Sequence, residues 1–226
     1  MSKRISRIFA NKNKKLITFV SGGDPNFNTS NKILKTIAKS GSDIIEIGMP
    51  FSDPMADGPT IQLSSNRSIA KGINLDRIFS LCINLRKINN NIPVVLMGYY
   101  NVIFHYGVKK FIHECRKNEI DGLIIVDLQP EEDTELLSEI KGTGIDLIRL
   151  ITPTTNVKRL KTILSHSSGF LYYVTITGIT GQASANLNEL NKSIKIIKKF
   201  TNLPIVSGFG IKNQKQVRDI CKISDG

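Results

Sequence analysis

The chain has 226 residues, of which 40% are hydrophobic, and this is enough to bury the core of one large α/β domain. It contains no run of the roughly 20 apolar residues that a membrane-spanning helix needs, and residues 1–15 lack the apolar stretch of a secretory signal. We therefore expect no membrane association, and a location in the cytoplasm or in the stroma of a plastid that encodes the protein.

The net charge of +12 leaves nucleic-acid binding open as an alternative function, because clustered lysines attract phosphate backbones. The lysines, however, lie mainly along segments with the spacing of amphipathic helices, such as the one with Lys195, Lys198 and Lys199 and the one at residues 212–222. This pattern is typical of solvated outer helix faces, and no recognised nucleic-acid-binding module is present. We expect a basic surface that attracts anionic substrates rather than a nucleic-acid partner.

The cysteines and histidines do not predict a metal site. The three cysteines are far apart and form no Cys-x-x-Cys pair, so neither a disulfide framework nor a zinc cluster is indicated. The three histidines show no ligand spacing either, and packing or surface roles account for them.

Seven short apolar segments rich in β-branched residues recur along the chain and predict strands. They cover residues 16–20, 43–47, 93–97, 123–126, 146–150, 170–175 and 203–207. Amphipathic segments with helical spacing lie between them, at residues 32–39, 75–88, 108–117, 131–141, 158–164 and 187–200. Because the strands are apolar almost throughout, they predict a parallel sheet covered by helices, either a barrel or a doubly wound open sheet.

Polar and glycine-rich stretches follow most of the predicted strands, and their distribution favours the barrel. They occupy residues 21–25, 48–59, 98–101, 127–132, 178–181 and 208–210. A TIM (β/α)8 barrel builds its active site from such a ring of loops at the carboxyl ends of its strands, whereas an open sheet binds its ligand at one switch point. We therefore predict a single TIM-barrel domain over residues 1–226.

The end of the sequence departs from this repeat. Residues 119–122 lead into a predicted strand, but the similar residues 223–226 lead into nothing, at the place where an eighth strand is due. We therefore expect a barrel truncated before its eighth strand, with unpaired edges on the first and seventh strands.

Segment 43–62 carries the most informative polar residues. Glu46 is flanked by isoleucines at the carboxyl end of a predicted strand, where a partly apolar pocket would raise its pKa and let it both accept and donate protons. Asp53 and Asp57 follow on a proline-rich loop, where solvent keeps them ionised until the site closes. Two carboxylates in different surroundings suit acid and base catalysis, but a structural carboxylate followed by two turn-forming aspartates fits the spacing equally well.

The whole of segment 43–62 closely resembles the signature of tryptophan synthase alpha chains. Further motifs that resemble this family recur in order at residues 19–25, 96–101, 172–181 and 204–211, so the resemblance covers essentially the entire chain. A single short motif has little weight, whereas five in sequence are specific. One loop departs from the family pattern, because it has Val126 and Gln129 where prolines are usual.

The resemblance implies a lyase of tryptophan biosynthesis, which splits indole-3-glycerol phosphate into indole and glyceraldehyde 3-phosphate by a retro-aldol reaction without a cofactor. It makes Glu46 the acid and base at the ring carbon and the side-chain hydroxyl. It makes Asp57 the group that accepts the indole N–H and stabilises the positive charge developing there. Tyr172 matches a tyrosine that lines the same site, where its hydroxyl assists a proton transfer or its ring only packs.

The resemblance also implies a set of substrate-binding residues. Gly181 and Gly210 match positions whose backbone N–H groups bind the phosphate, although a lone glycine is also typical of a turn. Thr180 would pair with Asp57 when the loops close and exclude water. The indole pocket would be lined by residues that fit a barrel core equally well: Phe19, Met97, Tyr99, Val126 and Phe209.

A protein partner follows from the same resemblance. Alpha chains of this family work with a beta chain that carries pyridoxal phosphate, in an α2β2 tetramer, and the contact face would be the loops at residues 50–54 and 101–106. A stand-alone lyase and a non-catalytic chain that only activates the beta chain stay open as alternatives. The family's Gly-Ser phosphate site follows an eighth strand, so we expect poor folding or weak phosphate binding from residues 1–226 unless they are part of a longer protein.

Overall fold

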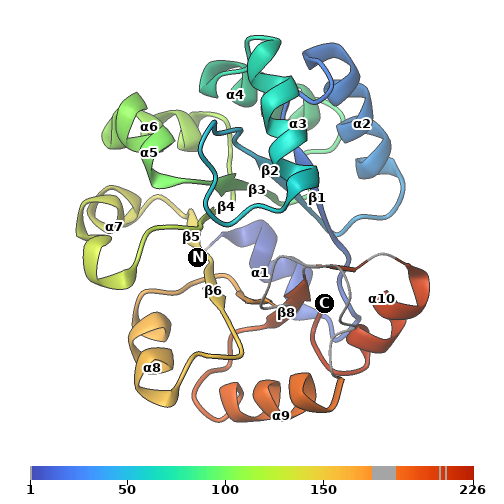
Figure 1. The fold of residues 1–226 in the computed structure, drawn as a ribbon, viewed down its shortest axis with the longest axis vertical. Coiled ribbons are helices and arrows are strands. Elements are labelled where there is room, and N and C mark those ends of the chain that lie inside the picture. The colour runs from blue at the N-terminus through green and yellow to red at the C-terminus, as the bar shows by residue number, and fades with distance from the viewer. Residues whose placement is uncertain (1, 175–186, 209, 212) are drawn as a thin grey trace.

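The backbone repeats one unit, a parallel strand followed by one or more helices, around a common centre (Figure 1). The computed structural model describes residues 2–174, 187–208, 210–211 and 213–226. Every segment predicted to be a strand contains one, and the arrangement is that of an α/β TIM barrel, as predicted. The strands are β1 (Ile17–Ser21), β2 (Ile44–Gly48), β3 (Val94–Gly98), β4 (Gly122–Ile125), β5 (Asp146–Leu147), β6 (Arg149–Ile151), β7 (Leu171–Val174) and β8 (Ile205–Gly208).

Neighbouring strands in the sequence are also neighbours in the sheet, and every pair is parallel. One ladder runs from β1 to β5 and a second from β6 to β8. β5 and β6 are two parts of a single predicted strand, because only Ile148 separates them and its N–H still donates to the carbonyl of Leu123 at 2.9 Å. The two ladders therefore join at Ile148 into one curved sheet.

The helices surround the strands in chain order, from α2 to α10 (Figure 1). None of those described is long and apolar enough to cross a membrane. They are α1 (Lys3–Ala10), α2 (Phe27–Lys39), α3 (Pro59–Ala70), α4 (Leu75–Arg86), α5 (Tyr100–Tyr106), α6 (Val108–Lys117), the short 3-10 helix η1 (Pro130–Glu132), α7 (Thr134–Ile140), α8 (Val157–Ser165), α9 (Leu187–Ile197) and α10 (Gln214–Cys221).

Three helices lie where the sequence analysis predicted none. α1 precedes the first strand, α3 begins at the last residue of the polar stretch after β2, and α5 takes up the segment at residues 101–106 that was expected to be a loop. The loop assignment at 101–106 is therefore wrong. Residues 131–141, predicted as one helix, instead form the end of η1 and all of α7.

Asparagine side chains begin four of the helices. Asn26, Asn74, Asn156 and Asn213 each accept a hydrogen bond from the backbone N–H three residues further on, at distances between 2.9 and 3.0 Å. A side-chain oxygen at this position replaces a carbonyl that the first turn of a helix lacks. The abundant asparagine of this chain thus fixes where α2, α4, α8 and α10 begin.

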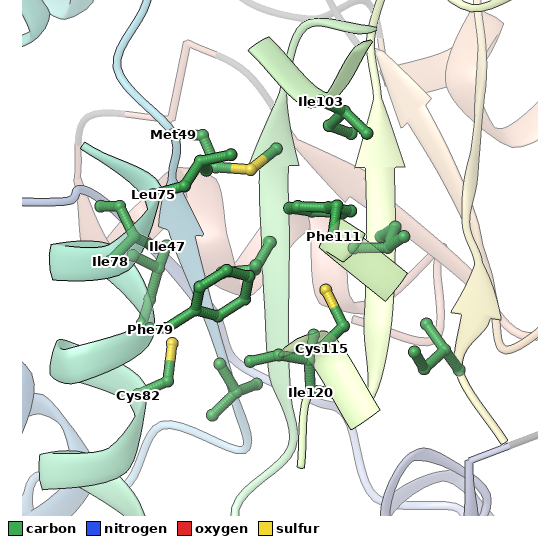
Figure 2. Packing of buried hydrophobic residues seen from close by; sticks show 14 of the residues in the cluster. Ile47, Met49, Leu75, Ile78, Phe79, Cys82, Ile103, Phe111, Cys115 and Ile120 are labelled. Carbon is green, nitrogen blue, oxygen red and sulfur yellow. The ribbon is translucent and has the colours of Figure 1, made fainter. Parts of the chain in front are cut away.

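An outer hydrophobic layer lies between the strands and the surrounding helices. Ile47 of β2 and residues of α4, α5 and α6 pack together there, as Figure 2 shows. The rings of Phe79 and Phe111, from α4 and α6, lie 5.8 Å apart, and both side chains are buried. This layer attaches the helices to the outside of the sheet, because burying large apolar side chains is the main favourable contribution to folding.

An inner hydrophobic layer fills the barrel. It takes alternate residues of the strands, so that Ile44 of β2 belongs to the inner layer while Ile45 and Ile47 belong to the outer one. The other members from the strands and the residues next to them are Ile17, Phe19, Val95, Met97, Ile124, Val126, Ile148, Leu150, Phe170, Tyr172 and Val206. This alternation decides which side chains reach the site, because successive residues of a strand point to opposite faces.

The first helix, α1, covers the amino-terminal ends of the strands. Ile5 is fully buried within the inner layer, and the ring of Phe9 lies 5.6 Å from that of Phe170. The Ser2 hydroxyl donates to the carboxylate of Asp121 at 2.7 Å, which anchors the helix beside β4. With this end covered, the carboxyl-terminal ends of the strands are left as the mouth.

Residues 225–226 pair with the sheet, contrary to the expectation that they lead into nothing. The Asp225 N–H donates to the carbonyl of Ile205 at 2.8 Å, and the Ser207 N–H donates to the carbonyl of Gly226 at 3.1 Å. The carbonyl of Asp225 in turn accepts the N–H of Lys15, which lies just before β1. These residues therefore bond to β8 on one side and to the start of the first strand on the other, so the predicted unpaired edges are partly covered.

Candidate active site

A cavity of about 860 Å³ opens at the carboxyl-terminal ends of the strands. Its wall includes the loop after β2, the ends of β3 and β4, and the loop after β6. Four residues predicted from the sequence line it: Asp57, Met97, Val126 and Gly210. The cavity therefore lies at the end of the barrel where TIM-barrel enzymes hold their substrates.

Glu46 is buried inside the barrel, with only 1% of its surface exposed. The alternation along β2 turns its side chain toward the inner layer, and in register it lies between Phe19 of β1 and Val95 of β3. One carboxyl oxygen, Oε1, has no hydrogen-bond partner among the described residues. Burial raises the pKa of Glu46 to about 8, because the charged form is not solvated there. At neutral pH the group is mostly a neutral acid that can give up a proton.

Glu46 does not line the cavity itself but lies one layer beneath it. Met97, which does line the cavity, pairs with Gly48, and Gly48 is the next inward-facing residue of β2 after Glu46. Asp57 lines the cavity from the loop above. Asp57 thus lines the cavity while Glu46 lies beneath it inside the barrel, a difference in depth that their positions in the sequence did not predict.

Two aromatic rings lie next to glycines in the barrel wall. A Cβ atom on Gly208 would lie 2.2 Å from the hydroxyl oxygen of Tyr172, and one on Gly48 would lie 2.9 Å from the ring of Phe19. Burial, followed by the nearby charge of Glu46, raises the pKa of Tyr172 well above its ordinary value. Tyr172 therefore lies inside the barrel within the electrostatic reach of Glu46, and its hydroxyl is protonated.

Asp57 is held by a tyrosine from the neighbouring strand end. The Tyr99 hydroxyl oxygen accepts the backbone N–H of Ala56 at 3.1 Å, and the hydroxyl donates to the carboxylate of Asp57. Partial burial raises the pKa of Asp57, and the hydrogen bond from Tyr99 opposes this shift. Tyr99 was predicted as a wall of the indole pocket. In the structure its hydroxyl bonds the loop that carries Asp57.

Arginines that the sequence analysis did not select form the opposite side of the cavity. Arg149 and Arg159 both line it, together with the threonines of the loop after β6. Arg149 is 5% exposed and pairs with the fully buried Asp133, which also accepts from Nδ1 of His166 at 2.9 Å. Arg149 could have been selected from the sequence, because it is a charged residue inside an apolar strand, the same feature that identified Glu46.

Three predicted site residues, Thr180, Gly181 and Phe209, lie outside the described residues. Gly210 is described and has a φ of +69°, a left-handed conformation that glycine adopts without strain. Within the part of the chain that the structure describes, no three histidine, cysteine or acidic side chains are grouped closely enough to hold a metal ion.

Comparison with known proteins shows similarity to a single protein family. The family model described as "Tryptophan synthase alpha chain" matches residues 5–226. Among solved structures, tryptophan synthase subunit alpha from Legionella pneumophila is 34% identical, with a TM-score of 0.90, and the match covers 100% of this chain and 85% of that one. The corresponding subunit from Campylobacter jejuni is 36% identical, with a TM-score of 0.86 and coverage of 98% and 88%.

A more distant match has the same fold. A chain of Mycobacterium tuberculosis tryptophan synthase is 28% identical and has a TM-score of 0.92, and the match covers 100% of this chain and 88% of that one. The high structural similarity at this identity agrees with the motif resemblance that runs along the whole sequence.

Proposed function

Because this chain belongs to the family of tryptophan synthase alpha chains, we propose that it cleaves indole-3-glycerol phosphate to indole and glyceraldehyde 3-phosphate. One observation carries the proposal: a buried, proton-holding Glu46 lies inside the barrel, one layer beneath the cavity that the loop carboxylate Asp57 lines. The products place the enzyme among the lyases of tryptophan biosynthesis. The reaction needs proton transfers rather than electron transfer, so no cofactor on this chain is part of the proposal.

Glu46 and Asp57 divide the chemistry between them. With its pKa near 8, Glu46 donates a proton to the ring carbon, after which the carbon–carbon bond can break. The carboxylate left behind accepts the proton of the side-chain hydroxyl, so the proton count balances over one turnover. Asp57 accepts the indole N–H and stabilises the positive charge that protonation puts on the ring. Burial, and then the charge of Glu46, contributes to the raised pKa of Tyr172, so the tyrosine belongs to the surroundings of Glu46.

Substituting asparagine for Asp57 tests this assignment. We expect Asp57→Asn to lower the rate of indole release by about a hundredfold, because a neutral amide stabilises the charged ring far less than a carboxylate does. The measurement is indole formed from indole-3-glycerol phosphate by the purified chain, alone and with a beta chain. For the purified chain alone, Asp53→Asn is the matched control, since Asp53 is an exposed carboxylate on the same loop and should keep its parental rate. Equal rates for the parent and Asp57→Asn would refute the proposed function.

The partner in this proposal is a beta chain that binds pyridoxal phosphate, assembled with the alpha chain as an α2β2 tetramer. Two exposed apolar side chains support a contact face at the mouth: Met55, which lines the cavity, is 81% exposed, and Phe104, on α5 after β3, is 63% exposed. Large apolar side chains that stay exposed are typical of protein interfaces. The predicted contact segment at 101–106 keeps this role although it is helical.

Size-exclusion chromatography with a bacterial tryptophan synthase beta chain measures this association. We expect the parent chain to co-elute with the yellow beta chain and Phe104→Asp to elute separately, because a buried unpaired charge at an interface costs several kcal/mol. Ile196→Asp on α9 is the control, since Ile196 is a similarly exposed apolar residue on a helix away from the mouth. Co-elution of Phe104→Asp would exclude α5 from the contact face. We further propose that the protein is located in the cytoplasm or in the stroma of a plastid. Cell fractionation would distinguish these two locations.

A further inference from the structure

The helix α5 begins without a capping side chain of its own. Its N-cap position is Tyr99, whose side chain makes no capping hydrogen bond. The first turn of a helix has backbone N–H groups without intrahelical partners, and these need an acceptor when water is excluded. Asp127, from the loop after β4, supplies one: its Oδ1 accepts the N–H of Tyr100 at 2.8 Å. The start of α5 is therefore fixed by a carboxylate 27 residues away in the sequence.

This cap fixes the residue that holds Asp57. Tyr99 directly precedes Tyr100, and its side chain is buried, with its ring 5.5 Å from that of Phe51. Its hydroxyl oxygen accepts a hydrogen bond from the N–H of Ala56, and the hydroxyl donates one to the carboxylate of Asp57. The backbone at the start of α5 and the loop after β2 are therefore joined through one side chain.

We propose that Asp127 is a positioning residue for Asp57, because it holds the start of α5 and so places the Tyr99 hydroxyl under the Asp57 carboxylate. The inference rests on the proposed function, in which Asp57 stabilises the developing charge on the indole. Geometry of this kind matters because a displacement of about 1 Å at a charge-stabilising group costs up to a hundredfold in rate.

The electrostatics around Tyr99 agree with a donor that keeps its proton. Burial first, and then the carboxylates of Asp57 and Asp127, raise the pKa of Tyr99 to about 12, while the Ala56 N–H opposes the shift. The phenol therefore keeps its proton near neutral pH and can donate it in a hydrogen bond to Asp57. Asp57 and Asp127 are the charged groups that act on Tyr99 from the two flanking loops.

A double-mutant cycle between Asp127 and Tyr99 tests the proposal. We expect Asp127→Ala to lower kcat for indole release about tenfold with KM changed less than threefold, because substrate still binds while Asp57 is misplaced. Asp127→Asn should stay within about threefold of the parent, since its amide oxygen still accepts the Tyr100 N–H. In a Tyr99→Phe background, Asp127→Ala should cost less than about twofold, because the connection it supports is already lost.

The pH profile separates positioning from a general loss of stability. Because the hydrogen bond from Tyr99 lowers the pKa of Asp57, its loss raises that pKa, and the acidic limb of kcat moves to higher pH. Asp127→Ala and Tyr99→Phe should both show this shift. An unshifted limb, or equal losses from Asp127→Ala in the two backgrounds, would overturn the proposal. Should Asp127→Ala fail to fold, Asp127→Ser replaces it, since its shorter side chain does not reach the Tyr100 N–H.

Failure of this inference is distinguishable from failure of the proposed function. If Asp57→Asn is inactive while Asp127→Ala keeps the parental kcat and pH profile, only the positioning role is wrong. If Asp57→Asn is fully active, the function itself is wrong.

Discussion

Glu46→Gln is expected to lower the rate of indole release by about a thousandfold. A positioned acid and base contributes roughly a hundredfold to ten-thousandfold to a reaction, and glutamine keeps the size of the side chain while it can neither donate nor accept the proton. The measurement is kcat with saturating indole-3-glycerol phosphate near pH 7.5, where a group with a pKa of about 8 is mostly protonated in the parent. Activity within tenfold of the parent would contradict the role of Glu46.

The same substitution provides its own control for folding. The folded-state pKa of Glu46 is about 8 and its ordinary value is 4.5, so between these pH values the folded chain holds a proton that the unfolded chain has released. The parent therefore loses stability as pH rises from about 4.5 to about 8. Glutamine does not ionise, so urea unfolding should show Glu46→Gln becoming steadily more stable relative to the parent over this range. Low activity in a stable variant then reports chemistry rather than unfolding.

Asp133→Ala is expected to destabilise the fold by about 3 to 5 kcal/mol, the usual cost of leaving a buried charge without its partner. Asp133 is fully buried and pairs with Arg149, whose Nη1 also donates to the carbonyl of Leu128 at 2.6 Å. Burial, and then the charge of Arg159, lowers the pKa of Arg149 to about 10, so it still carries its charge at neutral pH. Urea unfolding at pH 7 measures the loss.

Two further variants make this stability test specific. Glu131→Ala removes the partner of Arg159 at a largely exposed ion pair and should cost less than about 1 kcal/mol. Asp133→Ala combined with Arg149→Met removes both buried charges and should recover much of the lost stability. If Asp133→Ala costs no more than Glu131→Ala, the buried pair does not stabilise the fold as its geometry implies.

The strands could be predicted from the sequence because each is a short apolar run that the helices cover. Two of the three missed helices, α3 and α5, lack the apolar periodicity that identifies a helix in a sequence. α3 buries Ser64, Ser65 and Ser68 instead of large apolar residues, so its inner face has no hydrophobic period. α5 is only seven residues long and begins without a capping side chain of its own. Local signals were therefore too weak, and tertiary contacts decide the structure of these segments.

A site residue could be predicted where a charged side chain stands within an apolar segment. Contacts between residues far apart in the sequence could not be predicted. Glu46 stands out as an acid among isoleucines, and the structure places it inside the barrel. The contact of Asp127 with Tyr100 and the depth of Glu46 below the cavity both depend on how neighbouring loops and strands fit together. No spacing along a single segment carries that information.

The glycines at the ends of β2 and β8 make space for rings from adjacent strands, Phe19 beside Gly48 and Tyr172 beside Gly208. A side chain could enter either glycine position only if the neighbouring ring became smaller at the same time. The two residues of each pair should therefore change together during evolution. A substitution that alters the space at the barrel mouth then requires changes at two positions.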